Sequence, residues 1–142
     1  MSGGKILRLA VVAGATLLVV LSSLMFLAEI PLAVVKGESM FPLLREGDLV
    51  IIVRVKPEDI GVGDIIVFRT PNGRLVVHRV IDVVEVDGRK YYVTMGDNNR
   101  VRDVYYPVGV PYDRVIGKLM SFNGAVFKIP YLGHLSLLFK GS

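Results

Sequence analysis

Hydrophobic residues form one continuous run near the N-terminus, whereas they alternate with polar residues over most of the remaining chain. The run covers residues 9–28, twenty positions without a charged side chain. Each residue of a helix adds about 1.5 Å, so the run would span roughly 30 Å, the thickness of the hydrocarbon core of a bilayer. The pattern predicts a single transmembrane helix within residues 1–30.

Charged residues on both sides of this run predict the orientation of the helix. Lys5 and Arg8 precede it, and Glu29 follows it. Because positive charges are retained on the cytoplasmic side, we expect a single-pass protein of the cell membrane with a cytoplasmic N-terminus. The alternative is a secretory signal cleaved near the sequence FLAEI. The apolar core of such a signal is usually about 7–15 residues long, so the length of this run favours a retained anchor.

The chain after residue 31 has the pattern of β-strands joined by turns. Segments rich in β-branched and aromatic residues are bounded by Gly, Pro, Asn or Asp, which is typical of strands. The predicted strands cover residues 48–55, 64–69, 75–86, 90–95 and 115–122. No stretch of residues 31–122 has a convincing helical periodicity. We therefore predict a mainly β fold, with an extracytoplasmic β domain over residues 31–122 after the anchor.

Two dipeptides predict tight hairpins between these strands. Asn72-Gly73 and Asp87-Gly88 favour turns in which both central residues have positive φ. If Asp87-Gly88 is a two-residue loop, counting back along the two strands places His78 opposite Asp97. A bulge or a slip of one residue would break this register. The count predicts an imidazole and a carboxylate side by side.

The remaining residues, 123–142, form an apolar tail interrupted by Lys128, Pro130, Gly133 and His134. Its uninterrupted runs are short for a membrane span. We expect the tail to lie on the membrane surface or to pack against the sheet, with a second crossing as the alternative. His134 is expected at the membrane interface rather than in a catalytic site.

Composition narrows the chemistry that the chain can perform. It contains no cysteine, which excludes thiol nucleophiles, disulfides and thiolate metal sites. His78 and His134 are the only histidines and have no metal-ligand spacing around them, so no metal or cofactor is expected. The net charge of +4 comes from scattered basic residues without interleaved aromatic residues. This distribution argues against a nucleic-acid partner and favours anionic lipid headgroups.

One serine, one histidine and one acidic loop form a candidate catalytic group. Ser39 lies in the sequence GESMFP, His78 lies in the predicted strand VVHRV, and the loop GDNNRVRD carries Asp97 and Asp103. A serine becomes an effective nucleophile when a base takes its proton and a carboxylate orients that base. Taken singly, each feature also has an ordinary structural explanation: a turn serine, a buried strand histidine and a polar turn.

Taken in order, the motifs GESMFP, GDIIVFR, HRVI and GDNNRVRD after an N-terminal anchor resemble the type I signal peptidases, over the chain up to about Lys118. The resemblance implies a signal-peptidase-like antiparallel β domain in which Ser39 is the nucleophile of a Ser-Met-x-Pro box. Bacterial relatives use a lysine as general base. His78 stands in that place here, which marks the archaeal and endoplasmic-reticulum branch. In that branch the resemblance assigns the orienting role to Asp103, and Asp97, which the register count favours, is kept as a supporting site residue.

The resemblance also implies the reaction: a membrane-bound serine endopeptidase removes N-terminal signal peptides from exported preproteins after small residues. The implied partners are preprotein signal peptides, membrane lipid and the secretion machinery. Met40 and Pro42 are the expected substrate-binding residues. The chain departs from its relatives in two places. Arg102 stands where they often carry a second acid beside the orienting aspartate, and the C-terminal tail is short, whereas relatives that cross the membrane twice have a cleaner second span.

Two other classes of protein compete with this interpretation. Self-cleaving serine peptidases of the repressor type share the Ser-Met-x-Pro-like start, but they use a lysine base and have no anchor, so His78 argues against them. A non-catalytic, membrane-tethered β module that binds peptides is also compatible with the composition and the strand pattern. In such a module Ser39, His78 and Asp103 would be surface polar residues, and replacing them would leave its function intact.

Overall fold

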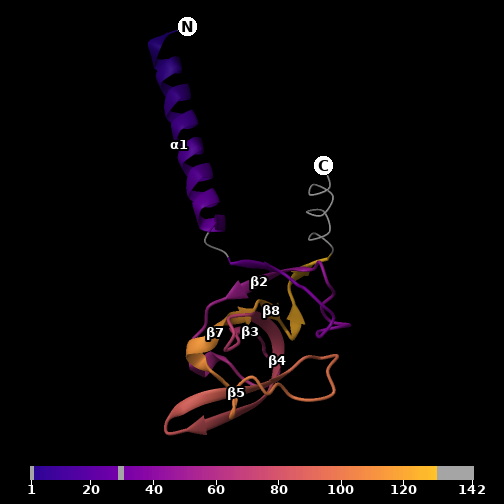
Figure 1. Ribbon diagram of the computed structural model, residues 1–142. Coiled ribbons are helices and arrows are strands. Elements are labelled where there is room, and N and C mark those ends of the chain that lie inside the picture. The colour runs from indigo at the N-terminus through magenta and orange to yellow at the C-terminus, as the bar shows by residue number, and fades with distance from the viewer. Residues whose placement is uncertain (1, 29–30, 131–142) are drawn as a thin grey trace. The chain divides into compact units, whose positions relative to one another are not determined.

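The computed structural model describes residues 2–28 and 31–130, and the chain divides into two compact units, Met1–Pro31 and Leu32–Ser142 (Figure 1). The first unit contains the helix α1, Gly3–Ala28. Its residues Gly3–Phe26 are apolar enough, and the helix is long enough, to cross a membrane. The apolar N-terminal helix predicted from the uncharged run is therefore confirmed.

Hydroxyl groups within α1 are satisfied by the helix itself. Thr16, Ser22 and Ser23 each donate to the carbonyl oxygen four residues earlier, at 2.8–2.9 Å. Lipid offers no hydrogen-bond partner, so an internal acceptor removes most of the cost of placing a hydroxyl in the hydrocarbon core. The few polar residues of this helix are thus compatible with a membrane span.

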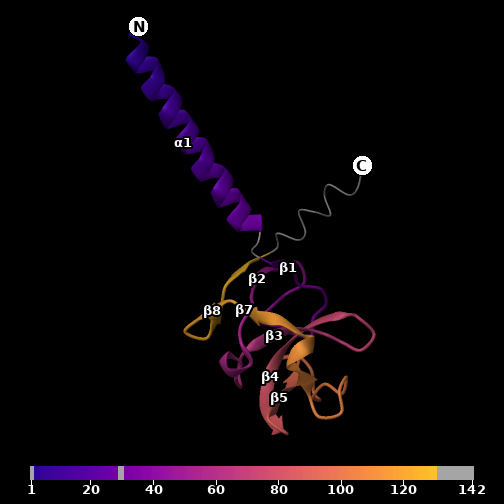
Figure 2. The same ribbon diagram turned by 90° about the vertical axis from the view of Figure 1, so that its left-hand side faces the viewer.

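The second unit is an antiparallel β domain (Figures 1 and 2). Within the described residues its main sheet has eight strands, in the order β1-β2-β7-β3-β4-β5-β6, with β10 also paired to β2; β8 and β9 form a separate hairpin. The strands are β1 Leu32–Val34, β2 Leu49–Val53, β3 Ile65–Arg69, β4 Leu75–Val86, β5 Arg89–Met95, β6 Val110–Pro111, β7 Val115–Leu119, β8 Ser121–Phe122, β9 Ala125–Val126 and β10 Lys128–Ile129. Two short 3₁₀ helices, η1 Pro57–Asp59 and η2 Tyr112–Arg114, connect them. The mainly β prediction is confirmed.

Strand β3 explains why the described part of the domain has two hydrophobic clusters. Successive side chains of a strand point to opposite faces, and both faces of β3 are covered. Ile65 and Val67 join a cluster that includes Met40 and Leu44, whereas Ile66 and Phe68 join a second cluster with Tyr92. The continuous apolar run of β3 is therefore that of a central strand, and β4, which carries His78, pairs with it along its length.

The two predicted hairpins differ in the structure. Asp87 and Gly88 have φ of 50° and 72°, as a two-residue loop requires, and Val86 pairs with Arg89. The prediction for this turn is confirmed. At Asn72-Gly73 only the glycine has positive φ, because the loop that joins β3 and β4 is longer than two residues, so the expectation of two left-handed residues is wrong there.

A β-bulge shifts the register between β4 and β5. Val80 pairs with Thr94, but Asp82 pairs with Val93, so Ile81 is an extra residue on β4. The count that places His78 opposite Asp97 assumes an unbroken ladder. It is therefore wrong by one residue.

The sheet continues beyond the predicted domain boundary at residue 122. An Asn123-Gly124 turn, with φ of 49° and 79°, closes the hairpin of β8 and β9, and β10 then pairs with β2. The first part of the predicted apolar tail is thus a strand of the domain. His134 and the rest of residues 131–142 lie outside the described residues.

Candidate active site

Ser39 lies in the loop that joins β1 to β2. A backbone hydrogen bond from Val35 N to Asp48 O, at 2.9 Å, closes the base of this loop. Two of its side chains, Met40 and Leu44, are buried in the first hydrophobic cluster and are 2% and 0% exposed. Because the residue directly after Ser39 is anchored in the core, the serine has little freedom to move relative to the sheet.

The acidic loop that begins at Gly96 packs against the backbone of Ser39. Asn98 N donates to Ser39 O at 2.8 Å, and Asn98 Nδ2 donates to Glu38 O at 3.2 Å. A Cβ atom on Gly96 would lie only 2.6 Å from the carbonyl oxygen of Ser39. Because position 96 is a glycine, the two loops can approach this closely. The loop of Ser39 and the acidic loop, nearly sixty residues apart in the sequence, thus meet at one site.

His78 lies on β4 and is hydrogen-bonded to Asp103. The distance from His78 Nδ1 to Asp103 Oδ2 is 2.6 Å, and the two side chains are only 6% and 10% exposed. The same carboxylate oxygen accepts a hydrogen bond from Thr94 Oγ1 at 2.6 Å, and Asp103 N donates to Thr94 O at 2.8 Å. A carboxylate held in this way orients an imidazole through Nδ1 and leaves Nε2 available to another group.

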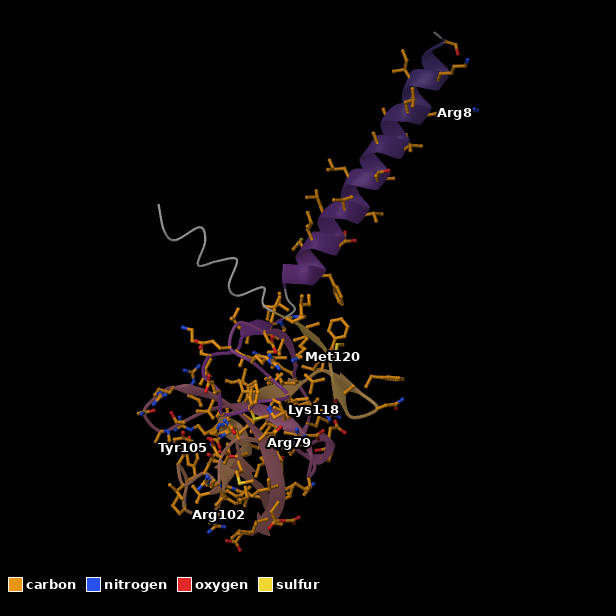
Figure 3. All side chains as sticks on the ribbon, turned by 90° about the vertical axis from the view of Figure 1, so that its right-hand side faces the viewer. Arg8, Arg79, Arg102, Tyr105, Lys118 and Met120 are labelled. Atoms are coloured by element: carbon orange, nitrogen blue, oxygen red, sulfur yellow. The ribbon has the colours of Figure 1, made fainter. Side chains whose placement is uncertain are left out.

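Asp97 contacts a different basic residue. Arg79 Nε and Nη2 donate to its two carboxylate oxygens, each at 2.8 Å, while Arg79 Nη1 donates to Gly63 O at 2.8 Å. The hydrogen bonds with Asp97 raise the pKa of the Arg79 guanidinium above its ordinary value, against the opposing effect of burial. The structure thus brings His78 together with Asp103 and not with Asp97. Asp97 instead ties the acidic loop to β4 through Arg79, which is labelled in Figure 3.

One aromatic ring packs against the imidazole, and a second ring packs against the first. Phe68 meets His78 edge to face, with ring centroids 6.4 Å apart, and meets Tyr105 in the same way at 6.0 Å. Phe68 is fully buried, whereas Tyr105 is partly exposed. The ring of His78 is therefore confined between a buried aromatic side chain and the Asp103 carboxylate.

Ser39 and His78 line the same groove, which has a volume of about 600 Å³. Its walls also include Met40, Asn99 and Tyr105, and much of the remaining lining consists of small or β-branched residues of β1, β3 and β4, among them Ala33, Val34, Val67 and Val77. Met40 thus lies both in the core and in the groove wall. Pro42, the other expected substrate-binding residue, is exposed on the same loop but lies outside the groove lining.

Thr94 and Asn98 are site residues that the sequence analysis did not single out. Asn98 lies within the GDNN motif, but its contact with Ser39 depends on the packing of two distant loops. Thr94 directly precedes the Met-Gly-Asp run, and its hydroxyl reaches Asp103 only because the chain returns to β5 after the loop. For Thr94 the sequence offers one signal of a role in the site: it is a polar residue in an otherwise apolar, buried part of β5, and a buried polar group needs a hydrogen-bond partner.

Comparison with known proteins identifies the family. Residues 6–107, which include Ser39, His78 and Asp103, match the family described as signal peptidase, peptidase S26. The chain belongs to the signal peptidase family. This confirms the resemblance drawn from the motifs.

Two similar relatives of this signal peptidase are eukaryotic. The signal peptidase complex catalytic subunit sec11 of Schizosaccharomyces pombe is 29% identical over 132 residues, covering 77% of this chain and 67% of the relative. The human signal peptidase complex catalytic subunit SEC11C is 33% identical over 117 residues, covering 78% of this chain and 58% of the relative. The chain thus spans a little over half the length of that human protein.

An archaeal relative also matches. An uncharacterized protein of Methanocaldococcus jannaschii is 25% identical over 170 residues, covering 75% of this chain and 82% of the relative. The similarity to both eukaryotic catalytic subunits and an archaeal protein places this signal peptidase in the archaeal and endoplasmic-reticulum branch.

Proposed function

We propose that Ser39, His78 and Asp103 form the catalytic triad of a membrane-bound serine endopeptidase that cleaves N-terminal signal peptides from preproteins after small residues. The observation that carries the proposal is the 2.6 Å hydrogen bond between His78 Nδ1 and Asp103 Oδ2, since His78 lines the same groove as Ser39. Family membership supplies the substrate class. The small and β-branched lining of the groove suits the small side chains that precede the cleavage point.

Each member of the triad has a defined role in the reaction. Asp103 accepts the Nδ1 proton of His78 and holds the tautomer whose Nε2 can act as a base. Nε2 takes the proton of Ser39 Oγ as that oxygen attacks the scissile carbonyl carbon, and then delivers it to the leaving amine. Water subsequently attacks the acyl-enzyme with His78 again acting as base, which releases the signal peptide and regenerates Ser39.

The developing oxyanion is stabilised by backbone amide. Among the described residues the N–H of Ser39 donates to no intramolecular acceptor, so it is available to a substrate oxygen. One such donor lowers the barrier by about 3 kcal/mol in comparable enzymes. This N–H shares a planar peptide group with the carbonyl of Glu38, which accepts a hydrogen bond from Asn98 Nδ2 at 3.2 Å, and this bond fixes the direction in which the amide points.

The helix α1 gives the enzyme access to its substrates. We assign it as a retained anchor with a cytoplasmic N-terminus, so that the β domain lies on the outer side, where signal peptides emerge. Confining the enzyme and the signal peptide to one membrane raises their effective concentration without any added contact. Membrane lipid and preprotein signal peptides are thus the partners, and the names of the eukaryotic relatives support association with other components of the secretion machinery.

Cleavage of a labelled preprotein in detergent tests this function. Wild type is compared with Ser39→Ala, His78→Ala, Asp103→Ala and Asp97→Ala. Because members of a triad act as a unit, kcat should fall by roughly 10⁴-fold or more for Ser39→Ala and His78→Ala, and more for Asp103→Ala than for Asp97→Ala. If wild type cleaves nothing, or if Ser39→Ala cleaves as well as wild type, the peptidase is excluded and the non-catalytic peptide-binding module takes its place.

A further inference from the structure

A lysine far from the catalytic motifs contacts the loop that carries Ser39. Lys128 lies on β10, where it pairs with Val50 of β2. Its Nζ donates to Leu43 O at 2.7 Å and to Asp48 Oδ2 at 2.8 Å. Both acceptors belong to the segment between Ser39 and β2, so the last described strand of the domain is tied directly to the loop of the nucleophile.

Asp48 is the centre of this contact. It is fully buried, and its Oδ2 also accepts a hydrogen bond from Arg45 N at 3.0 Å, while Asp48 N donates to Arg45 O at 3.0 Å. A buried carboxylate is costly unless a positive charge and hydrogen bonds compensate it. The ammonium group of Lys128 supplies charge from the solvent side, since its side chain is 28% exposed against 1% for Asp48.

These contacts continue to Ser39 through short backbone steps. Leu44 N donates to Met40 O at 2.9 Å, so the turn that Lys128 holds at Leu43 is bonded to the residue directly after Ser39. On the other side Asn98 N holds the carbonyl of Ser39 itself. The loop of Ser39 is therefore held from two sides, by Asn98 of the acidic loop and by Lys128 of β10.

We propose that Lys128 is a positioning residue for Ser39, and that its ammonium group holds the loop of residues 38–48 in the geometry that catalysis requires. The proposal rests on the proposed function for its effect on catalysis. It extends the active site to a residue that lies beyond the segment matched to the signal peptidase family, residues 6–107. Lys128 touches neither the substrate nor the reacting atoms and acts only through the loop.

A second lysine provides a matched control. This lysine is Lys118, which is labelled in Figure 3. Its Nζ donates to Asp59 O at 3.0 Å and to Asp64 Oδ2 at 3.3 Å, and its side chain is 26% exposed. It thus makes the same two kinds of contact as Lys128, with a backbone carbonyl and a carboxylate. Neither of its acceptors lies on the loop of Ser39.

The experiment compares Lys128→Met and Lys118→Met in the full chain in detergent, measuring kcat and KM on a labelled preprotein and amide hydrogen exchange of residues 38–48. A small misplacement of a reacting group costs up to about 10²-fold, so kcat of Lys128→Met should fall by about 10- to 100-fold with little change in KM. Hydrogen exchange of residues 38–48 should become faster. Lys118→Met should change neither kcat nor this exchange.

Chemical rescue separates the charge from the bulk of the side chain. Since the chain has no cysteine, Lys128→Cys introduces a single thiol. Its thiolate displaces bromide from 2-bromoethylamine to give a thioether that ends in an ammonium group, or from 1-bromopropane to give a neutral chain of the same length. The ammonium form should recover most of kcat and the slow exchange, and the neutral form should not.

The outcomes separate this proposal from the proposed function. Unchanged kcat and exchange in folded Lys128→Met, equal losses in Lys118→Met, or equal rescue by both alkyl groups would overturn the role of Lys128. If wild type cleaves no preprotein, the proposed function fails, and hydrogen exchange alone then decides whether Lys128 holds the loop. Should Lys128→Met fail to fold, Lys128→Gln replaces it; a neutral amide removes the positive charge that compensates Asp48, so kcat should fall, and wild-type kcat would overturn the proposal.

Discussion

Asp97 and Asp103 show at the scale of single residues how position decides what a side chain does. Both lie in one loop, six positions apart, and both are carboxylates that contact a basic side chain. Asp97 forms a two-pronged pair with Arg79, a geometry that a guanidinium favours. Asp103 accepts from a histidine and a threonine through one oxygen, which suits the orientation of an imidazole.

Thr94 gives a prediction at this scale. Thr94→Val keeps the shape of the buried side chain but removes the hydroxyl that donates to Asp103 Oδ2. A hydrogen bond to a charged group is worth about 1.5–3 kcal/mol. Since Asp103 orients His78 in the transition state, losing this bond should raise the activation barrier and lower kcat by about 10- to 100-fold. The measurement is kcat and KM on a labelled preprotein.

Thr94→Ser is the control, because it keeps the hydroxyl and loses only a methyl group. It should retain most of the wild-type kcat. Equal losses in the serine and valine variants would show that packing at Thr94, rather than its hydrogen bond to Asp103, supports the reaction.

At the scale of elements, the site depends on how closely two loops approach. The loop after β5 packs against the turn of Ser39 through the hydrogen bond from Asn98 N, and Gly96 lies where there is no room for a side chain. Its added Cβ would meet both the carbonyl oxygen of Ser39, at 2.6 Å, and Asn99 Nδ2, at 2.7 Å. Backbone atoms cannot be displaced as easily as the end of a flexible side chain, so a larger residue must move one loop.

Gly96→Ala should therefore damage catalysis more than folding. Displacing Ser39 relative to His78 by about 1 Å is expected to lower kcat by about 10²-fold. Gly61→Ala is a suitable comparison, because a Cβ there meets nothing within 4 Å and its φ is not in the left-handed region. Preprotein cleavage and the thermal unfolding midpoint are measured for both variants; wild-type activity in Gly96→Ala would contradict the close approach.

At the scale of the whole molecule, Tyr92 links the second hydrophobic cluster to the connection after β2. Its ring is fully buried, and its hydroxyl donates to Pro57 O of η1 at 2.9 Å. Burial raises the pKa of Tyr92 above its ordinary value, and the negative charges of Tyr112 and Glu58 act in the same direction. Folding therefore keeps this phenol protonated at a pH where the unfolded chain begins to ionise it.

This shift predicts a loss of stability at high pH. A group whose pKa is raised in the folded state contributes its stability fully below the unfolded pKa of about 10 and loses it as pH rises further. The thermal unfolding midpoint of wild type in detergent should fall between pH 8 and pH 11. Tyr92→Phe should lower the midpoint at pH 8, because a hydrogen bond worth about 1 kcal/mol is lost, but should show a smaller fall towards pH 11. Equal falls in both proteins would contradict the role of Tyr92.

Local interactions explain why several features could be predicted from the sequence. A long run without charges predicts an apolar helix at any position in the chain. The free energy of placing such a segment in lipid depends only on its own backbone and side chains. Strands rich in β-branched residues and the Asp87-Gly88 turn are likewise decided by neighbouring residues. The ordered motifs around Ser39 and His78 were sufficient to indicate the signal peptidase family.

What only the tertiary structure decided is which of these residues meet. One extra residue at Ile81 shifts the ladder of β4 and β5, and a shift of one position changes every pairing beyond it. Three hydrogen bonds join residues that are distant in the sequence: His78 with Asp103, Thr94 with Asp103, and Lys128 with Asp48. Such contacts depend on the summed geometry of turns, bulges and packing, which no single segment of the chain contains.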